Sequence, residues 1–283
     1  MSRTGLVMEG GAMRGMYTTG VIDVMMENGI TYDGAIGVSA GAVFGCNYKS
    51  HQIGRPIRYN KRFCKDKTYC SVRSLLTTGD IYGANMCYNV IPYKLDKFDI
   101  ETYRANPMTF TVVATDCETG KPVYKQLDMG DGEDMLWFRA SASMPMASRP
   151  VEIGGRTYLD GGTTDSIPLE YFEKAGYDKN VVIMTQPDGY RKGPARHRAL
   201  MKVLLARLPA VYQAMIDRPA MYNAQLAYVK EAEKEGRAFA IYPPEPLNIG
   251  ATCDKPEELE RVYQIGRRTC EERLDDLKRF LGL

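Results

Sequence analysis

Two consecutive units of strand, glycine turn and helix fill the first 50 residues, and they restrict the fold more than any other feature of the sequence. A short apolar run at 4–8 ends in two glycines, and apolar residues at helical spacing follow over 13–28. The pattern then repeats with an apolar strand at 32–37 and a helix-like stretch at 39–44. Two such units in succession need parallel strands joined by right-handed crossovers. We therefore predict an α/β fold with a central, mostly parallel sheet.

Further strands are expected up to about residue 185, and helices beyond it. Residues 55–107 show no clean period and are predicted to form short helices and loops. Hairpins are predicted from β-branched runs flanking turn residues, at 109–127 and 151–159. The other predicted elements are a helix at 135–142, a buried strand at 181–185, and helices at 195–215, 221–235 and 257–280.

Composition excludes several classes of function. The chain has 283 residues, and its 37 Lys and Arg against 35 Asp and Glu give a formal charge of only +2, so no bulk electrostatic case for nucleic-acid binding exists. Seven cysteines without a C-x-x-C pair, and only two histidines, argue against a zinc site and for reduced thiols. With no signal-like N-terminus and no run of 18 apolar residues, we expect a soluble, cytoplasmic protein.

Gly37-Val38-Ser39-Ala40-Gly41 fits the G-x-S-x-G elbow. A serine on a sharp strand-to-helix turn needs small residues two positions before and after it, because the strand and the helix approach closely there. Such a serine also faces unpaired N–H groups at the start of a helix, which favour developing negative charge. The context of an apolar strand before the motif and a helix after it favours a nucleophile over a chance glycine turn.

Neither histidine suits a catalytic triad. His51 is expected at the far end of the helix that follows Ser39, pointing away, and His197 lies in a cationic stretch that would disfavour an imidazolium. Asp160, in the string Asp160-Gly161-Gly162 after a predicted strand, is the alternative base, although a lone D-G-G is usually only a turn. A carboxylate that accepts directly from a serine hydroxyl works if burial raises its basicity.

A glycine-rich loop leaves the first strand and opens the first helix. In Glu9-Gly10-Gly11-Ala12-Met13-Arg14-Gly15, consecutive small residues can direct several N–H groups into one concavity, which suits a phosphate or a tetrahedral oxyanion. Arg14 either pins this loop or neutralises a lipid phosphate. The equally weighted alternative for Arg14 is a surface cation or an internal salt bridge.

Together, the loop near residue 10, the G-x-S-x-G turn and D-G-G resemble the patatin-like phospholipase family in order and approximate spacing. The segment 139–145, Arg-Ala-Ser-Ala-Ser-Met-Pro, is similar to the bacterial branch of that family. The resemblance spans residues 4–190 and implies a three-layer α/β/α fold and hydrolysis of phospholipids, acylglycerols or simple esters. We accordingly predict a patatin-like catalytic domain at 1–190 and a mostly helical C-terminal region, 191–283, packed on it.

The resemblance also implies a role for individual residues. Ser39 would be the nucleophile, activated by Asp160 without histidine, and would pass through an acyl-enzyme. No cofactor and no metal is implied. The other implied roles are oxyanion-hole amides from Gly10, Gly11 and Ala12, support of that loop by Arg14 and Gly15, and shaping of the nucleophile turn by Gly37 and Gly41.

Ala12 departs from the family pattern, which has a third glycine in the loop. An alanine N–H can still donate if its φ is negative, but the methyl group crowds the oxyanion hole. Because losing one oxyanion donor costs on the order of 10²–10³ in rate, the backbone geometry at Ala12 bears on substrate range and rate.

Two other functions compete with hydrolysis. Gly10, Ala12 and Gly15 form a degraded G-x-G-x-x-G, and Asp33 could hold the ribose of a nucleotide, but alanine replaces the glycine that would meet the pyrophosphate. This interpretation also leaves the Ser39 turn unexplained. In the third interpretation, the fold is kept for binding or regulation and the active site is idle.

Residues 191–207 carry six basic residues and no acidic one, while Leu200, Val203, Leu204 and Leu208 can share a helix face. Such a helix could lie transiently on an anionic membrane, which would make the protein peripheral there. We favour the alternative that the helix packs on the core with a solvated basic face. The predicted partner is a lipid or acyl-ester substrate, without nucleic acid, and the sequence carries no signal for an oligomeric state.

Overall fold

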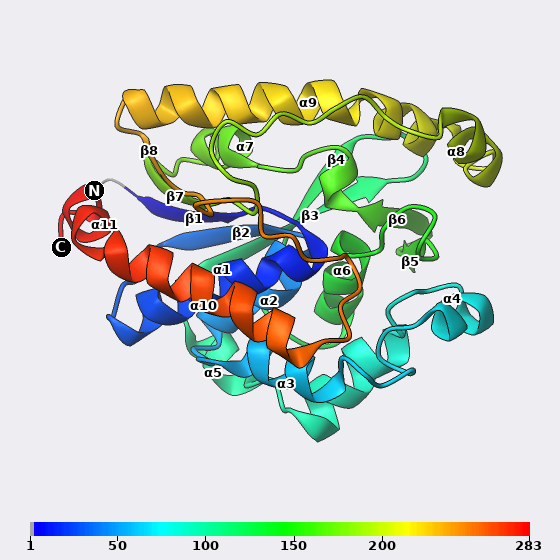
Figure 1. Cartoon of the computed structure of the whole chain (residues 1–283), viewed down its shortest axis with the longest axis horizontal. Helices are drawn as coiled ribbons and strands as arrows, with labels where there is room; N and C mark the ends of the chain where they lie inside the picture. Colours follow the sequence, from blue (N-terminus) through cyan, green and yellow to red (C-terminus); the bar gives the residue numbers. More distant parts are fainter. Residues whose placement is uncertain (1–2) are drawn as a thin grey trace.

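The computed structural model describes residues 3–283 and has three layers, with a mixed sheet between two layers of helices (Figure 1). The strands are β1 (Thr4–Met8), β2 (Gly34–Val38), β3 (Thr109–Asp116), β4 (Pro122–Gln126), β5 (Val151–Ile153), β6 (Arg156–Asp160), β7 (Lys179–Ile183) and β8 (Ala238–Ile241). Their order is β5-β6-β3-β2-β1-β7-β8, with β4 also paired to β3. The run from β3 to β8 is parallel, which confirms the predicted fold class, while β4, β5 and β6 pair antiparallel.

The helices divide between the two faces of the sheet. They are α1 (Gly15–Glu27), α2 (Ala40–Lys49), α3 (Arg55–Phe63), α4 (Val72–Thr78), α5 (Ile100–Ala105), α6 (Glu133–Ser141), α7 (Leu169–Lys174), α8 (Arg198–Leu204), α9 (Pro209–Lys234), α10 (Pro256–Glu272) and α11 (Leu274–Leu281). Helices α7 and α9 cover one face, and α1, α2 and α10 the other (Figure 1). Along β1, Leu6 and Met8 join the core under α1 and α2, whereas Val7 joins the core under α7 and α9, as the alternation of a strand requires.

Strands β2 and β6 meet end to end along one edge of β3. β4 pairs with Thr111–Thr115 and therefore occupies the opposite edge, because each strand has only two edges. On the shared edge, the parallel β2 ends with Val38 opposite Val113, and the antiparallel β6 ends with Asp160 opposite Ala114. The carboxyl ends of β2 and β6 thus converge, and the residues that follow them lie close together although they are far apart in the sequence.

Residues 55–98, here called the cap segment, form short helices below the sheet. They include α3, α4 and a π-helix, η2 (Met86–Leu95), which contains Pro92. A π-helix is rare and is found mostly at functional sites, since its wider turn re-aims side chains. The prediction of short helices here is confirmed.

The C-terminal helices differ from the predicted ones. We expected helices at 195–215 and 221–235, and the predicted position of the interruption between them is wrong. Helix α8 ends at Leu204, and α9 runs from Pro209 through Pro219 to Lys234. A proline removes one hydrogen bond from a helix but suits its first turn, so Pro209 starts α9 whereas Pro219 only interrupts its ladder. The single helix expected at 257–280 is divided at Arg273 into α10 and α11.

The C-terminal region also supplies a strand that the sequence analysis missed. β8 pairs in parallel with β7 and extends the sheet. Helix α10 packs on α1 across two glycines: a Cβ on Gly20 would lie 2.1 Å from the Tyr263 carbonyl oxygen, and one on Gly266 would lie 2.1 Å from that of Tyr17. Within residues 3–283, no helix combines the length and apolar character that crossing a membrane would require.

Candidate active site

Ser39 stands on a strained turn between β2 and α2. Its φ of 54° and ψ of −120° lie in a region that non-glycine residues rarely adopt. The turn is closed by near contacts at both motif glycines: a Cβ on Gly37 would lie 2.4 Å from the Gly41 carbonyl oxygen, and one on Gly41 would lie 2.3 Å from that of Met8. The G-x-S-x-G spacing therefore follows from the crowding of β1, β2 and α2 around the serine.

Asp160 lies directly opposite Ser39. The Ser39 hydroxyl donates to Asp160 Oδ2 at 2.6 Å, and the Gly162 N–H donates to Oδ1 at 2.8 Å. Both side chains are buried. Burial raises the pKa of Asp160, although the hydrogen bond from Ser39, the positive charge of Arg218 and the Gly162 N–H oppose that shift. A carboxylate with a raised pKa is a stronger base than an exposed carboxylate, and Asp160 already accepts a hydrogen bond from the Ser39 hydroxyl.

Ser141, at the end of α6, holds the backbone of the turn. Its Oγ accepts the Ser39 backbone N–H at 3.0 Å, which gives a buried donor its partner. The sequence analysis quoted Ser141 within the segment 139–145 but assigned it no role. No sequence pattern predicts this role, because a serine that accepts a hydrogen bond from a distant backbone N–H leaves no periodic pattern. The two serines of Ser141–Ala142–Ser143 are the only local feature that draws attention to it.

The glycine loop passes beside Ser39. A Cβ on Gly10 would lie 2.9 Å from the Val38 carbonyl oxygen and 3.0 Å from Ser39 Cβ, so only glycine fits there. Within residues 3–283, the N–H groups of Gly10, Gly11 and Ala12 have no recorded hydrogen-bond acceptor, and they remain as donors beside the serine. Ala12 has a φ of 48°, in the left-handed region, so the negative φ on which we based its donor role is not found.

The side chain of Arg14 does not pin the loop. Its backbone N–H donates to the Gly11 carbonyl at 3.0 Å, but its Nε is buried and has no partner within the described residues. Gly15 instead brings the loop onto α2, because a Cβ there would lie 2.8 Å from Ala40 Cβ. Support of the loop thus comes from packing at Gly15.

Glu9 is a further residue of the site that the sequence analysis missed. It is buried and accepts hydrogen bonds from the Thr185 N–H and the Tyr222 hydroxyl, both at 2.6 Å. Thr185 also donates its hydroxyl to the Gly10 carbonyl at 3.0 Å. Burial raises the pKa of Glu9, against these hydrogen bonds and the charge of Arg14. Glu9 therefore ties the loop to β7 and α9, contacts that only the folded chain brings together.

An apolar pocket opens beside Ser39 and runs along α2 beneath the cap segment. Its volume is about 120 Å³, and aliphatic, aromatic and sulfur side chains line it, among them Val43, Phe44, Tyr59, Tyr88, Ile91 and Phe138. A water-sized group needs roughly 10–15 Å³ of such space, so the pocket has room for about ten of them in a row or cluster. A single acyl chain of medium length meets these dimensions.

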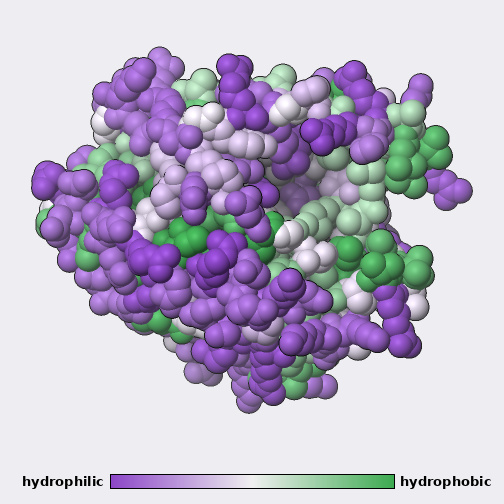
Figure 2. All heavy atoms as spheres, in the orientation of Figure 1, coloured by the Kyte–Doolittle hydropathy of each residue, from purple (hydrophilic) through white to green (hydrophobic). Residues whose placement is uncertain are grey.

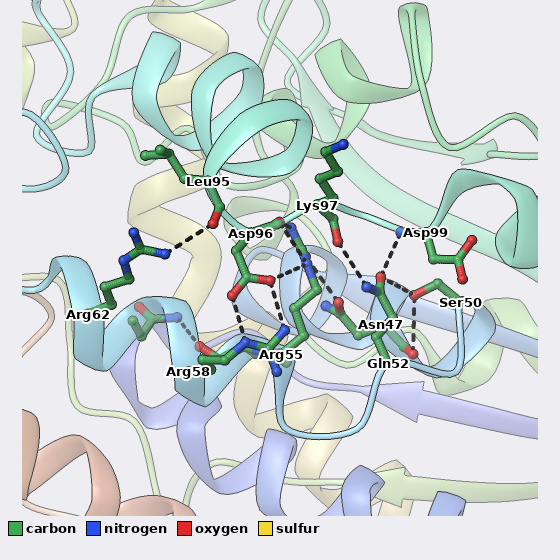
Figure 3. A network of polar contacts seen from close by, with 12 residues as sticks. Asn47, Ser50, Gln52, Arg55, Arg58, Arg62, Leu95, Asp96, Lys97 and Asp99 are labelled. Carbon is green, nitrogen blue, oxygen red and sulfur yellow. Dashed lines mark hydrogen bonds and ion pairs between the residues drawn. The ribbon is translucent and has the colours of Figure 1, made fainter.

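Arg55 also lines this pocket. It is 5% exposed, and it donates to Asn47 Oδ1 at 3.1 Å and to the Asp96 carbonyl oxygen at 2.7 Å (Figure 3). Because Asn47 follows Ser39 by about two turns of helix, Asn47 is about 12 Å from the serine along α2. Arg58 donates two hydrogen bonds of 2.8 Å to the Asp96 carboxylate, which joins the two ends of the cap segment, while Arg55 ties the segment to α2 through Asn47.

The residues of the competing interpretations lie elsewhere. Asp33 accepts from the Thr4 N–H at 2.7 Å at the amino end of β1 and β2, whereas the glycine loop follows the carboxyl end of β1. The ribose role proposed for Asp33 is therefore wrong. His51 and His197 are both exposed, as predicted, and the hydrogen bonds of Ser39 go to Asp160 and Ser141. Among residues 3–283, no three Asp, Glu, His or Cys side chains converge as metal ligands would.

The fold and the site together define a class of protein: a three-layer α/β/α chain with a serine on a strained turn that faces a buried carboxylate. The family model of the patatin-like phospholipases matches residues 6–173, which is more than half of the chain. The chain therefore belongs to the patatin-like phospholipase family. A second model, described as a domain of unknown function (DUF6363), matches residues 208–282.

Curated relatives have low sequence identity. The Escherichia coli protein YjjU is 25% identical over 94% of this chain and 75% of its own length. An NTE family protein of Mycobacterium tuberculosis is 28% identical over 69% of this chain, which spans about half (51%) of that relative. The lysophospholipase NTE1 of Coccidioides immitis is 25% identical over 99% of this chain but only 18% of its own length. VipD from Legionella pneumophila is a similar solved structure, with 14% identity, a TM-score of 0.45, and coverage of 98% of this chain and 67% of VipD.

Proposed function

We propose that this protein is a serine hydrolase of lipid acyl esters, with Ser39 as nucleophile, Asp160 as its base and the amides of Gly10 and Gly11 as the oxyanion hole. The positive φ of Ala12 does not meet the condition that we set for a third donor. The observation that carries the proposal is the 2.6 Å hydrogen bond from Ser39 Oγ to the buried Asp160 carboxylate, at the mouth of an apolar pocket. Membership of the patatin-like phospholipase family supports the class of reaction.

The reaction proceeds in two halves. Asp160 Oδ2 takes the hydroxyl proton as Ser39 Oγ bonds to the ester carbonyl carbon, and the carbonyl oxygen becomes an oxyanion that accepts from the loop N–H groups. The C–O bond to the alcohol then breaks, and the alcohol leaves with the proton from Asp160. Water next attacks the acyl-serine and gives its proton to Asp160. The tetrahedral species then collapses with cleavage of the bond to Ser39 Oγ, which takes the proton back from Asp160, and the fatty acid is released. Because one carboxylate moves the proton in both halves, no histidine is needed.

The substrate class follows from the walls of the site. The pocket along α2 is apolar and adjoins Ser39, so it would hold the acyl chain. Burying each methylene contributes about 0.8 kcal/mol, which makes chain length a strong determinant of binding. The similarity to a lysophospholipase agrees with a single-chain lipid as substrate.

We propose further that the protein works in the cytoplasm and touches membranes transiently through α8. Leu200, Val203 and Leu204 are 57%, 72% and 57% exposed, so the face that we expected to pack on the core is largely solvated, and that expectation is wrong for these residues. Hydrophobic side chains gather on α8 above a hollow in the surface and around α4 below it (Figure 2). Apolar side chains among the basic residues of 191–207 suit an anionic bilayer. The seven cysteines are free thiols, in keeping with a reducing compartment.

The test of the hydrolase uses p-nitrophenyl esters and a fluorophosphonate probe. The wild-type protein should hydrolyse the esters and be labelled at Ser39, and Ser39→Ala should lose both with unchanged far-UV circular dichroism. Ser50→Ala, at the other end of α2, is the matched control and should keep both. Labelling without turnover, or neither, would favour the idle-site interpretation in which the fold serves binding or regulation.

A test of membrane contact is co-sedimentation with vesicles. The protein should bind vesicles containing phosphatidylglycerol more strongly than phosphatidylcholine alone. Replacing Leu200, Val203 and Leu204 together by serine should weaken binding several-fold through lost burial of apolar area. Equal binding of the triple variant would remove α8 from the contact surface.

A further inference from the structure

Three cationic side chains lie around the glycine loop and the Asp160 turn, and none of them lines the apolar pocket. Arg14 belongs to the glycine loop, Lys192 to the segment between β7 and α8, and Arg218 to α9. All three are half-buried, and within residues 3–283 none of them forms a salt bridge with Asp or Glu. Cations left half-buried without a carboxylate partner are costly, which favours a role in binding an anion.

Each cation is linked to the glycine loop or to the Asp160 turn through one intervening residue. The Arg218 Nε donates to the Gly162 carbonyl at 2.5 Å, and a Cβ on Gly162 would lie 3.1 Å from Asp160 Oδ1 and 3.4 Å from Arg218 Nη2. The Lys192 ammonium is 4.9 Å from the centre of the Tyr222 ring, whose hydroxyl donates to Glu9. Arg14 follows Ala12 by two residues. The three side chains therefore surround the loop and the Asp160 turn.

The nearby carboxylates Glu9 and Asp160 attract these cations, but they form no salt bridge with them within the described residues. Glu9 is held by Thr185 and Tyr222, and Asp160 by Ser39 and Gly162. Burial and the charges of Arg218 and Arg14 together lower the pKa of Lys192 to about 8, and the charge of Glu9 opposes that shift. The cations thus repel one another, and a bound anion would relieve that repulsion.

We propose that Arg14, Lys192 and Arg218 bind a phosphate group on the alcohol side of the ester, so that the substrate's acyl chain and its phosphate lie on opposite sides of Ser39. The inference rests on the proposed hydrolase function for the identity of the substrate, but the site itself consists of cations whose binding can be measured without turnover. Arg218 comes from the region matched by the domain of unknown function, and Lys192 lies beyond the patatin-like match. The C-terminal region would then complete the headgroup side of the active site.

The experiment compares two ligands that differ only in the phosphate, 1-octanoylglycerol and 1-octanoylglycerol 3-phosphate. Their affinities are measured by calorimetry with Ser39→Ala, which binds without turnover. We expect the phosphate ligand to bind at least about tenfold more tightly, because hydrogen bonds between charged groups are stronger than those between neutral ones. Adding Lys192→Ala should remove most of that preference, and adding Arg191→Ala, its exposed neighbour, should leave it in place.

Equal affinity for the two ligands, or a preference that Lys192→Ala does not reduce, would overturn the phosphate site. Inorganic phosphate forms the second arm: if it displaces the phosphate ligand only at far higher concentration, the site takes a lipid headgroup, and if it binds as tightly, the site takes free phosphate. Turnover is measured separately on the wild-type protein. Loss of hydrolysis of both esters would refute the proposed function while leaving the binding result valid.

Discussion

The two sides of Ser39 differ in chemistry. On the side of α2 and the cap segment, the pocket is lined by aliphatic, aromatic and sulfur side chains. On the side of α9, Arg14, Lys192 and Arg218 stand without salt bridges within the described chain. An ester of an amphiphile, the substrate class that we propose, would satisfy both sides with its carbonyl at the boundary, where Ser39 and Asp160 lie. In the proposed function, the contrast orients the substrate before any bond changes.

The largest expected effect on activity comes from Asp160, at the boundary between the apolar and the charged side. Asp160→Asn removes the base, so ester hydrolysis should fall by about 10⁴-fold or more, as for loss of the base or its partner in other serine hydrolases. Because the pKa of Asp160 is raised in the folded state, its ionised form costs stability as pH rises through that pKa. Asparagine avoids this cost, so the variant should melt at a higher temperature at pH 8 while its activity is lost.

Asp165→Asn is the matched control. Asp165 is also buried with a raised pKa, but it is hydrogen-bonded to Tyr124 and Gln225 rather than to Ser39. Its activity should stay within a few-fold of wild type in the same ester assay. An active Asp160→Asn variant would show that another group takes the proton.

The second-largest effect tests whether the apolar pocket holds the acyl chain. Val43→Phe places a ring in the pocket, which should lower kcat/KM for p-nitrophenyl decanoate by about 100-fold, since excluding four methylenes forfeits about 3 kcal/mol. The acetate ester should lose far less, because its acyl group reaches only the mouth. Val72→Phe, on an exposed position of α4, is the control. Equal losses on both esters would mean that the acyl chain lies elsewhere.

The pH dependence of the reaction tests the charged side through Arg218. In the proposed mechanism the carboxylate form of Asp160 is the base, so kcat/KM should rise with pH through the raised pKa of Asp160, above the usual aspartate range. The positive charge of Arg218 lowers that pKa, and Arg218→Ala should therefore move the rising limb to higher pH. Arg218→Lys should restore its position. A limb that does not move in Arg218→Ala would limit Arg218 to packing.

The smallest effect concerns Ala12, which belongs to the loop and to the pocket. Left-handed backbone costs alanine roughly 1–2 kcal/mol, whereas glycine pays about 0.4–1 kcal/mol in unfolded-state entropy. Ala12→Gly should therefore stabilise the protein by up to about 1.6 kcal/mol in a denaturant titration. Ala12→Val should destabilise the protein, because a β-branched side chain tolerates left-handed backbone less well than alanine does. If Ala12→Val were the more stable variant and Ala12→Gly the less stable one, the backbone at this position would not be strained.

Local patterns predicted most of the fold. The two β-turn-α units, the hairpins and the strand at β7 followed from periodicity and turn residues, because these elements are determined by neighbours in the sequence. The break in the C-terminal helices was misplaced because Pro219 looks like a terminator, whereas the packing of Tyr222 and Val229 carries α9 past it. β8 was missed because four residues give too short a pattern to distinguish from a loop.

The site was predicted less evenly. Ser39 and Asp160 stood in motifs, and the structure brings them within hydrogen-bond distance. Ser141, Glu9 and Arg218 could not be found in this way, since each acts through a contact with a distant backbone or side chain. The role of Arg14 as a pin for the loop was likewise a guess about a contact, and its side chain does not make it.

The meeting of β2 and β6 on one edge of β3 has a consequence for synthesis. Ser39 and Asp160 are 121 residues apart, and translation at about 5–20 residues per second separates their appearance by roughly 10 s. During that interval the nascent chain carries Ser39 without its hydrogen-bond partner. The Ser39–Asp160 pair therefore cannot form until β6 has been synthesised.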